Sequence, residues 1–128
     1  MKNPVFQYNP GDEVGELEDW PWTNPASNYV IHEGDPRASG RMEAGGPGHT
    51  TRFGIWRCTK GKVECTELGD ELMTILSGHV RLINVADGSV NELGPGDSIF
   101  TSDGMRVIWD VTEDVTKVFF GHKADGFK

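Results

Sequence analysis

Hydrophobic residues in this chain occur in short runs separated by turn residues, most clearly between Asp70 and Trp109. Mainly apolar runs at 72–76 and 80–85 flank a Ser-Gly pair, and a Gly-Pro-Gly-Asp corner leads into a further run at 98–101. Short apolar runs bounded by such residues predict antiparallel strands joined by tight turns. We therefore expect a hairpin around Ser77-Gly78 and an antiparallel meander over the whole stretch.

The segments on either side of this meander also consist of short apolar runs bounded by turn residues. Residues 51–59 alternate in side-chain direction and carry apolar residues on both faces, which predicts a strand. Further strands are expected at 28–36, 63–68, 90–93, 107–111 and 115–120, whereas glycines predict a loop over 37–51. No segment keeps a helical period, so the predicted fold class is all-β, either a sandwich or a closed barrel.

Residues 1–28 differ from the rest of the chain because they hold four prolines, a density that excludes a helix. Trp20 and Trp22 flank one of these prolines, and indole rings are costly to leave in water. We expect this arm to pack its aromatic side chains on the barrel or on a partner subunit, with a disordered acidic tail as the alternative. The predicted organisation is an irregular arm over 1–28 and one β-barrel domain over 29–128.

Size and charge limit the classes of partner. A length of 128 residues fits one domain, and 20 acidic against 12 basic residues give a net charge of -8. That charge disfavours binding to nucleic acid or to an anionic membrane surface. No apolar run approaches the roughly 20 residues of a membrane-spanning helix. The first twelve residues contain no apolar signal-peptide core, so a cytoplasmic location is expected.

Cys58 and Cys65 are the two cysteines of the chain. A chain of this length does not need a disulfide to stabilise it, so reduced thiols are expected. Neither a CxxC pair nor a Cys/His pair with metal-binding spacing is present, which argues against structural zinc.

The order of acid, strand, glycine turn, strand and Pro-Gly-Asp corner resembles the core of the cupins, which are small jelly-roll barrels. Glu71, six residues and Gly78 match the end of the first cupin motif, G-x5-H-x-H-x3/4-E-x6-G. Gly96 and the 102–104 segment match the frame of the second motif, G-x5-P-x-G-x2-H-x3-N, with Ser102 replacing its proline. The resemblance covers residues 51–120 and implies a single-domain double-stranded β-helix, the cupin jelly-roll barrel.

A closer resemblance is to small single-domain cupins grouped with the ureidoglycine aminohydrolase cupin domain. It rests on five parts of the sequence: Phe53–Lys62, Asp70-Glu71, Gly94–Asp97, Trp109 and Lys117. Most single-domain members of that group have no assigned reaction, so the resemblance implies the fold rather than the chemistry. Ureidoglycine aminohydrolysis itself is not expected, because that reaction resembles a metal-dependent one and this chain lacks the set of metal ligands.

In cupins, the histidines and the glutamate of the two motifs hold a divalent metal inside the barrel. The histidine positions carry other residues here: Glu64 and Thr66, or Cys65 and Glu67 with the shorter spacing, and Val107. Glu71 is the only usual ligand retained, so a three-histidine metal site is not expected. The cofactor is left open, and a divalent metal beside Glu71 is one alternative.

With the shorter spacing, Cys65, Glu67 and Glu71 point into the barrel, because residues two apart on a strand share a face. Two carboxylates in a cavity raise each other's proton affinity, which suits a general acid or base. Lys117 either pairs with Glu71, binds a substrate carboxylate or faces solvent on an edge strand. The alternative for the carboxylates is Glu67 on the rim and Glu71 in a structural hydrogen bond.

The candidate catalytic residues are therefore Glu71, Glu67 and Lys117, and the candidate pocket residues are Cys65, Arg106, Val107 and Trp109. One function that fits them is an isomerase, lyase or hydrolase acting on a small polar metabolite. A second is a non-catalytic cupin that binds or senses such a metabolite, and a third is a homodimeric structural module whose arm swaps between subunits. Fold resemblance does not choose among these functions.

Overall fold

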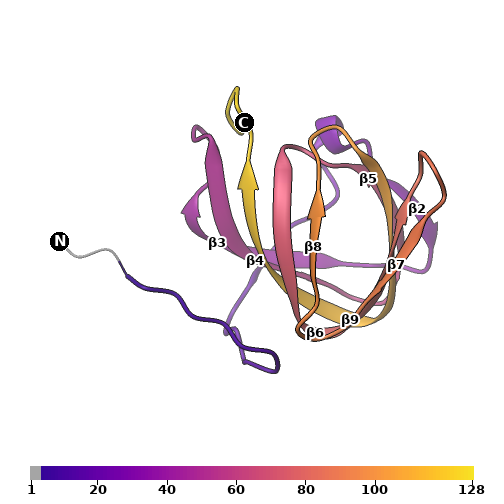
Figure 1. Cartoon of the computed structure of the whole chain (residues 1–128), viewed down its shortest axis with the longest axis horizontal. Helices are drawn as coiled ribbons and strands as arrows, with labels where there is room; N and C mark the ends of the chain where they lie inside the picture. Colours follow the sequence, from indigo (N-terminus) through magenta and orange to yellow (C-terminus); the bar gives the residue numbers. More distant parts are fainter. Residues whose placement is uncertain (1–3) are drawn as a thin grey trace.

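The structure is a computed structural model that describes residues 4–128. Strands dominate it, and Figure 1 shows them curling into a barrel, with the indigo start of the described chain lying outside it. The elements are β1 (Glu18–Asp19), η1 (Pro25–Ser27), β2 (Val30–Glu33), β3 (Ala38–Gly45), β4 (Thr51–Cys58), β5 (Gly61–Thr66), β6 (Asp70–Asn84), β7 (Val90–Leu93), β8 (Ser98–Thr101) and β9 (Arg106–His122). The predicted all-β jelly-roll class is confirmed. No helix within residues 4–128 is long and apolar enough to cross a lipid bilayer.

Two long strands, β6 and β9, connect the halves of the barrel. All the pairings in the described chain are antiparallel: β9 pairs with β4, β5 and β6, and β6 also pairs with β7 and β8. The other strands extend this arrangement in the order β1-β3-β4-β9-β5-β2. Side chains from β4, β5, β6 and β9 therefore meet in the barrel interior, where the core and the buried charges described below lie.

The predicted hairpin around Ser77-Gly78 is wrong, because β6 continues through these residues as one strand. The register between β6 and β9 shifts on both sides of Ser77, and Gly78 adopts a φ of +80°. A Cβ at this glycine would overlap the carbonyl oxygen of Asp114. The glycine therefore makes a bulge that bends the strand, and β9 likewise runs unbroken through the predicted gap at 112–114.

The predicted loop over 37–51 is also wrong in its first half, where residues 38–45 form β3 and pair with β4. The physical reason is that a glycine in this strand lies so close to neighbouring residues that a larger side chain would not fit. A Cβ at Gly40 would overlap the ring of Trp20 and lie close to the carbonyl oxygen of Ile55. This glycine therefore allows an indole to pack directly on the strand backbone.

The arm packs its aromatic rings on the barrel of the same chain. Trp22 donates its indole N–H to the carbonyl oxygen of Pro36 at 2.9 Å, and its ring lies 4.9 Å from that of Tyr29. Trp20 packs edge-on against Phe119 of β9, with ring centroids 6.4 Å apart. These contacts bring residues 20–29 over the barrel interior.

The bulge generates a testable prediction. Gly78→Ala should lower the free energy of unfolding by about 3 kcal/mol or more, because it adds a steric overlap to the cost of a left-handed backbone. Gly88→Ala is the matched control, since Gly88 has a φ of +73° and no atom within 4 Å of an added Cβ. It should cost about 1 kcal/mol. Chemical denaturation measures both, and equal losses would contradict the proposed role of the Gly78 bulge.

Candidate functional site

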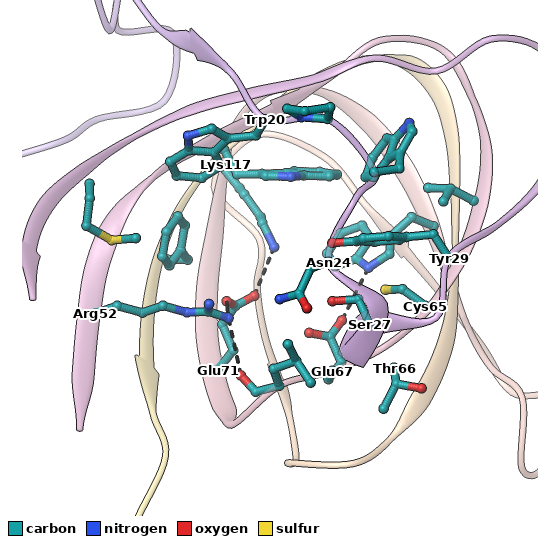
Figure 2. A pocket seen from close by; sticks show the side chains of 18 residues that line it. Trp20, Asn24, Ser27, Tyr29, Arg52, Cys65, Thr66, Glu67, Glu71 and Lys117 are labelled. Atoms are coloured by element: carbon teal, nitrogen blue, oxygen red, sulfur yellow. Dashed lines mark hydrogen bonds and ion pairs between the residues drawn. The ribbon is translucent and has the colours of Figure 1, made fainter. Parts of the chain in front are cut away.

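A cavity of about 180 Å³ lies inside the barrel, between the arm and strands β4, β5, β6 and β9. Six of the residues that line it are aromatic: Trp20, Trp22, Tyr29, Trp56, Trp109 and Phe119. Its polar side chains come from the arm, the barrel strands and the β5–β6 turn, and include Asn24, Ser27, Arg52, Glu67, Glu71 and Lys117. Figure 2 shows the ends of Asn24, Ser27, Glu67 and Lys117 directed toward the same space.

Glu71 of β6 and Lys117 of β9 form an ion pair in this cavity. The Lys117 ammonium donates to Glu71 Oε2 at 2.9 Å and contacts the Met73 sulfur at 3.1 Å. It also lies 4.3 Å from the ring centroid of Trp109 and 4.7 Å from that of Trp56. Both charged side chains are more than nine-tenths buried, so each compensates the desolvation of the other.

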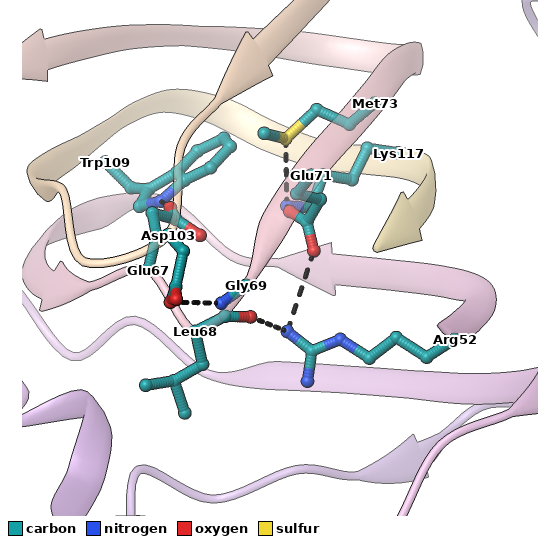
Figure 3. Close-up of polar contacts among 9 residues, drawn as sticks. All are labelled: Arg52, Glu67, Leu68, Gly69, Glu71, Met73, Asp103, Trp109 and Lys117. Carbon is teal, nitrogen blue, oxygen red and sulfur yellow. Dashed lines mark hydrogen bonds and ion pairs between the residues drawn. The ribbon is translucent and has the colours of Figure 1, made fainter. Parts of the chain in front are cut away.

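Arg52 of β4 places a second cation beside the same carboxylate. Its Nη2 lies 3.8 Å from Glu71 Oε1 and donates to the carbonyl oxygen of Leu68 at 3.2 Å. The guanidinium stacks on the ring of Phe127, 4.2 Å from its centroid. Glu71 therefore lies between two cations, as Figure 3 shows.

Glu67 follows the end of β5, and its backbone is held on both sides by hydrogen bonds to the turn before β9. Its N–H donates to the carbonyl oxygen of Met105 at 2.8 Å, and its carbonyl accepts from the N–H of Gly104 at 2.9 Å. The neighbouring Gly69 N–H donates to Asp103 Oδ1 at 2.8 Å, which fixes the same turn. The side chain of Glu67 is thereby directed into the cavity, where the residue is only 8% exposed.

The carboxyl of Glu67 has a different environment from that of Glu71. Its side-chain hydrogen bond within residues 4–128 comes from the indole N–H of Trp109 at 3.3 Å. Burial and then the charge of Glu71 raise the pKa of Glu67 to about 7, against the opposing effects of Lys117 and Trp109. Near neutral pH this carboxyl is therefore able both to accept and to release a proton.

The structure resolves which face of the β5 region points inward. Glu64 lies on the outer side, where it accepts from Arg106 at 2.6 Å and contacts His32 at 2.8 Å. Cys65 and Glu67 lie on the inner side with Glu71. Glu67, Glu71 and Lys117 thus come together in one cavity, while their catalytic roles stay predictions.

Two of the four predicted pocket residues lie elsewhere. Trp109 and Cys65 line the cavity, but Arg106 and Val107 do not. Arg106 lies on the opposite face of β9 from Trp109 because side chains alternate along a strand, and it binds Glu64 on the outside of the barrel. Val107 is packed into the core, fully buried and paired in register with Cys65.

Both cysteines are free and buried. Burial raises the pKa of the Cys65 thiol far above its usual range, and that of Cys58 to about 12. A thiol that stays protonated is a poor nucleophile. Cys65 therefore acts as a packing residue in the cavity wall.

Several lining residues were not predicted from the sequence as site residues. Arg52 is one, although extending the alternation of β4 back from Trp56 and Gly54 would have placed it on their face. The barrel strands supply others, among them Met42, Trp56 and Phe119, and the arm supplies Trp20, Trp22, Asn24, Ser27 and the adjoining Tyr29. The Trp-Pro-Trp segment signalled burial, but no local pattern marks Asn24 or Ser27 as facing a cavity.

The residues present do not fit the divalent metal of the cupin motifs. Glu71, at the glutamate position, binds the ammonium of Lys117, and the histidine positions on the inner face carry Cys65, Glu67 and Val107. Among residues 4–128, no three or more His, Cys, Asp or Glu side chains form a group that could hold a metal ion. The cation next to Glu71 is instead part of the chain.

Comparison with known proteins identifies relatives of the fold. Residues 45–119 match the family model described as the EutQ-like cupin domain. A search of curated proteins found no match. The EutQ protein of Clostridium difficile is one similar solved structure, with 16% identity over 71% of this chain and 71% of its own and a TM-score of 0.60.

Two further solved structures show how varied such relatives are. A protein of unknown function from Pseudomonas syringae pv. tomato str. DC3000 has 23% identity over 85% of this chain and 45% of its own, with a TM-score of 0.65. Ectoine synthase from P. lautus has 11% identity over 66% of this chain and 63% of its own, with a TM-score of 0.57. Likeness at these identities shows the fold alone.

The buried ion pair generates a prediction. Lys117→Met should lower the free energy of unfolding by about 3 to 5 kcal/mol, because it leaves the Glu71 carboxylate buried without its closest partner. The double variant Lys117→Met/Glu71→Leu should lose less than the sum of the single losses, as measured by urea denaturation. Arg37→Met is the control, since Arg37 pairs with Asp35 at the exposed surface and should cost under about 1 kcal/mol. Strictly additive losses would contradict the coupling of Lys117 to Glu71.

Proposed function

The chain belongs to the EutQ-like cupin family, and from that premise we propose that its barrel cavity binds a small polar metabolite and that Glu67 exchanges a proton with it. The family match spans residues 45–119, which include Glu67, Glu71 and Lys117. Because one cupin fold serves proteins of different function, the proposal rests on the cavity.

The observation that carries this proposal is the contrast between the two buried carboxyls. Glu71 is engaged by an ammonium at 2.9 Å and a guanidinium at 3.8 Å, as expected of a structural carboxylate. Glu67 is as deeply buried but is held at its side chain by one indole N–H at 3.3 Å. Two carboxyls whose environments separate their proton affinities are a recurring arrangement in acid–base catalysis.

The dimensions of the cavity support a small ligand. About 180 Å³ is less than the 300 to 1,000 Å³ typical of sites for drug-sized molecules. Aromatic rings form much of the wall, while polar groups from the arm and the barrel face the same space. Such a site selects a compact metabolite by its few polar groups.

Glu71 and Lys117 take a supporting part in this proposal. The charge of Glu71 raises the pKa of Glu67, and the ammonium of Lys117 lowers it. Burial has the largest effect on the proton affinity of Glu67, and the two members of the ion pair modify it in opposite directions. On this proposal Glu67 is the catalytic residue, and Glu71 and Lys117 are positioning residues.

Non-catalytic binding of the same metabolite is the second candidate function. It is favoured because, among the described residues, the Glu67 carboxyl has an indole N–H and no second acid or base within hydrogen-bonding distance.

Three narrower statements stay predictions: membership of the ureidoglycine aminohydrolase cupin type, a cytoplasmic location and a homodimer. The exposed side chains of Leu72, Phe100 and Phe120 favour the homodimer, because they are neighbours across β6, β8 and β9.

A screen of small polar metabolites tests the proposal. A metabolite that raises the melting temperature of the wild type should also raise that of Glu67→Gln, because the amide keeps the size of the side chain. Proton NMR of the mixture should then show conversion by the wild type and at least about 100-fold slower conversion by Glu67→Gln.

Glu64→Gln is the matched control, since this carboxylate lies on the outside of the barrel. It should convert the metabolite at the wild-type rate. Equal rates for Glu67→Gln and the wild type would remove Glu67 from the chemistry, and binding without conversion by the wild type would establish the non-catalytic alternative.

A further inference from the structure

The charges that line the cavity balance only when Glu67 is ionised. Lys117 and Arg52 supply two positive charges and Glu71 supplies one negative charge. A protonated Glu67 therefore leaves one positive charge in excess, and an ionised Glu67 cancels it. Lys117, Glu71 and Glu67 are more than nine-tenths buried and Arg52 is three-quarters buried, so water screens an excess charge here only in part. A ligand that enters beside a protonated Glu67 is therefore favoured when it carries one negative charge.

We propose that the cavity takes a small monocarboxylate, and that binding is accompanied by the uptake of one proton from solvent onto Glu67. The negative charge of the ligand replaces that of the glutamate, so the buried space stays neutral. The protonated Glu67 then becomes a hydrogen-bond donor to the ligand carboxylate. This inference rests on the proposed function, because it needs the cavity to be a binding site.

Hydrogen-bond donors around the cavity match a carboxylate. The side-chain oxygen of Asn24 accepts from the N–H of Ala26 at 3.0 Å, which leaves the amide NH2 as the group that points away from this bond. The hydroxyls of Ser27 and Tyr29 belong to the same wall, opposite Lys117 (Figure 2). A carboxylate has about four acceptor sites, which such a set of donors is able to fill.

A cationic ligand fits this cavity less well. With Glu67 ionised, a cation would leave one positive charge in excess. The faces of Trp56 and Trp109, which would attract a cation, are already in contact with the Lys117 ammonium. A neutral amide would leave the charges unchanged and so would gain nothing from protonation of Glu67.

The pH dependence follows from the groups that face Glu67. The charged ones are Glu71 on β6, Lys117 on β9 and Arg52 on β4. Cys65 on β5 and Tyr29 before β2 stay neutral near pH 7, because burial raises the pKa of each. A bound carboxylate adds a negative charge next to Glu67 and favours its protonated form. Affinity should therefore be high below the pKa of Glu67 and fall as the pH rises through it.

Calorimetric titration of the wild type with propionate, propionamide and propylammonium tests this inference, because the three probes share a carbon chain and differ in charge. Propionate should bind at least tenfold more tightly than either of the other two at pH 6. Its Kd should rise about tenfold between pH 6 and pH 8, the ratio of the protonated fractions of a group with a pKa near 7. At pH 8, buffers of different ionisation enthalpy should reveal the uptake of about one proton.

Glu67→Gln should bind propionate with the same Kd at pH 6 and pH 8 and without proton uptake, whereas Glu64→Gln should behave as the wild type. Tighter binding of propionamide or propylammonium, a Kd for the wild type that does not change with pH, or no propionate binding would each overturn the inference. A neutral metabolite converted by Glu67 would still leave the proposed function standing. If propionate binding is linked to proton uptake but no metabolite is converted, the inference stands and the proposed catalytic proton transfer by Glu67 is rejected.

Discussion

The ion pair between Lys117 and Glu71 is the interaction on which the cavity depends. Both charges are buried, and neither would be tolerated there alone. Their pairing fixes a cation against the faces of two tryptophans and a carboxylate between that cation and Arg52. In the cupin motifs the glutamate position binds a metal, whereas in this chain it binds a lysine side chain. The positive charge of the site is thus supplied by the polypeptide.

Because of this pairing, two glutamates that are close in sequence have different hydrogen-bond partners and charged neighbours. Glu71 accepts bonds from its cations, while Glu67 lies in the same cavity with an indole as its side-chain partner. Burial together with the neighbouring negative charge raises the pKa of Glu67 toward neutrality. The same difference underlies both the proposed proton exchange and the proposed choice of a monocarboxylate.

Sequence patterns predicted the strands well where side-chain alternation and turn residues agree, as over 51–59, 90–93 and 98–101. They failed at Gly78 and Gly40, because a glycine that makes a bulge or allows close packing looks like a turn residue in sequence. One residue of uncertainty in motif spacing left Glu64 and Glu67 as alternatives, since a shift of one residue changes the face of a strand. The cavity wall formed by the arm could not be predicted, because Asn24 reaches the site through tertiary contacts alone.

The most direct test of this account is the titration of the Glu67 side chain itself by carboxyl carbon NMR, with the resonance assigned by its loss in Glu67→Gln. The account predicts a midpoint at about pH 7 for the wild type. A midpoint near 4.5, the ordinary value for a glutamate, would mean that Glu67 is ionised throughout the neutral range. That result would contradict both the proton exchange assigned to this residue and the proton uptake on binding a carboxylate.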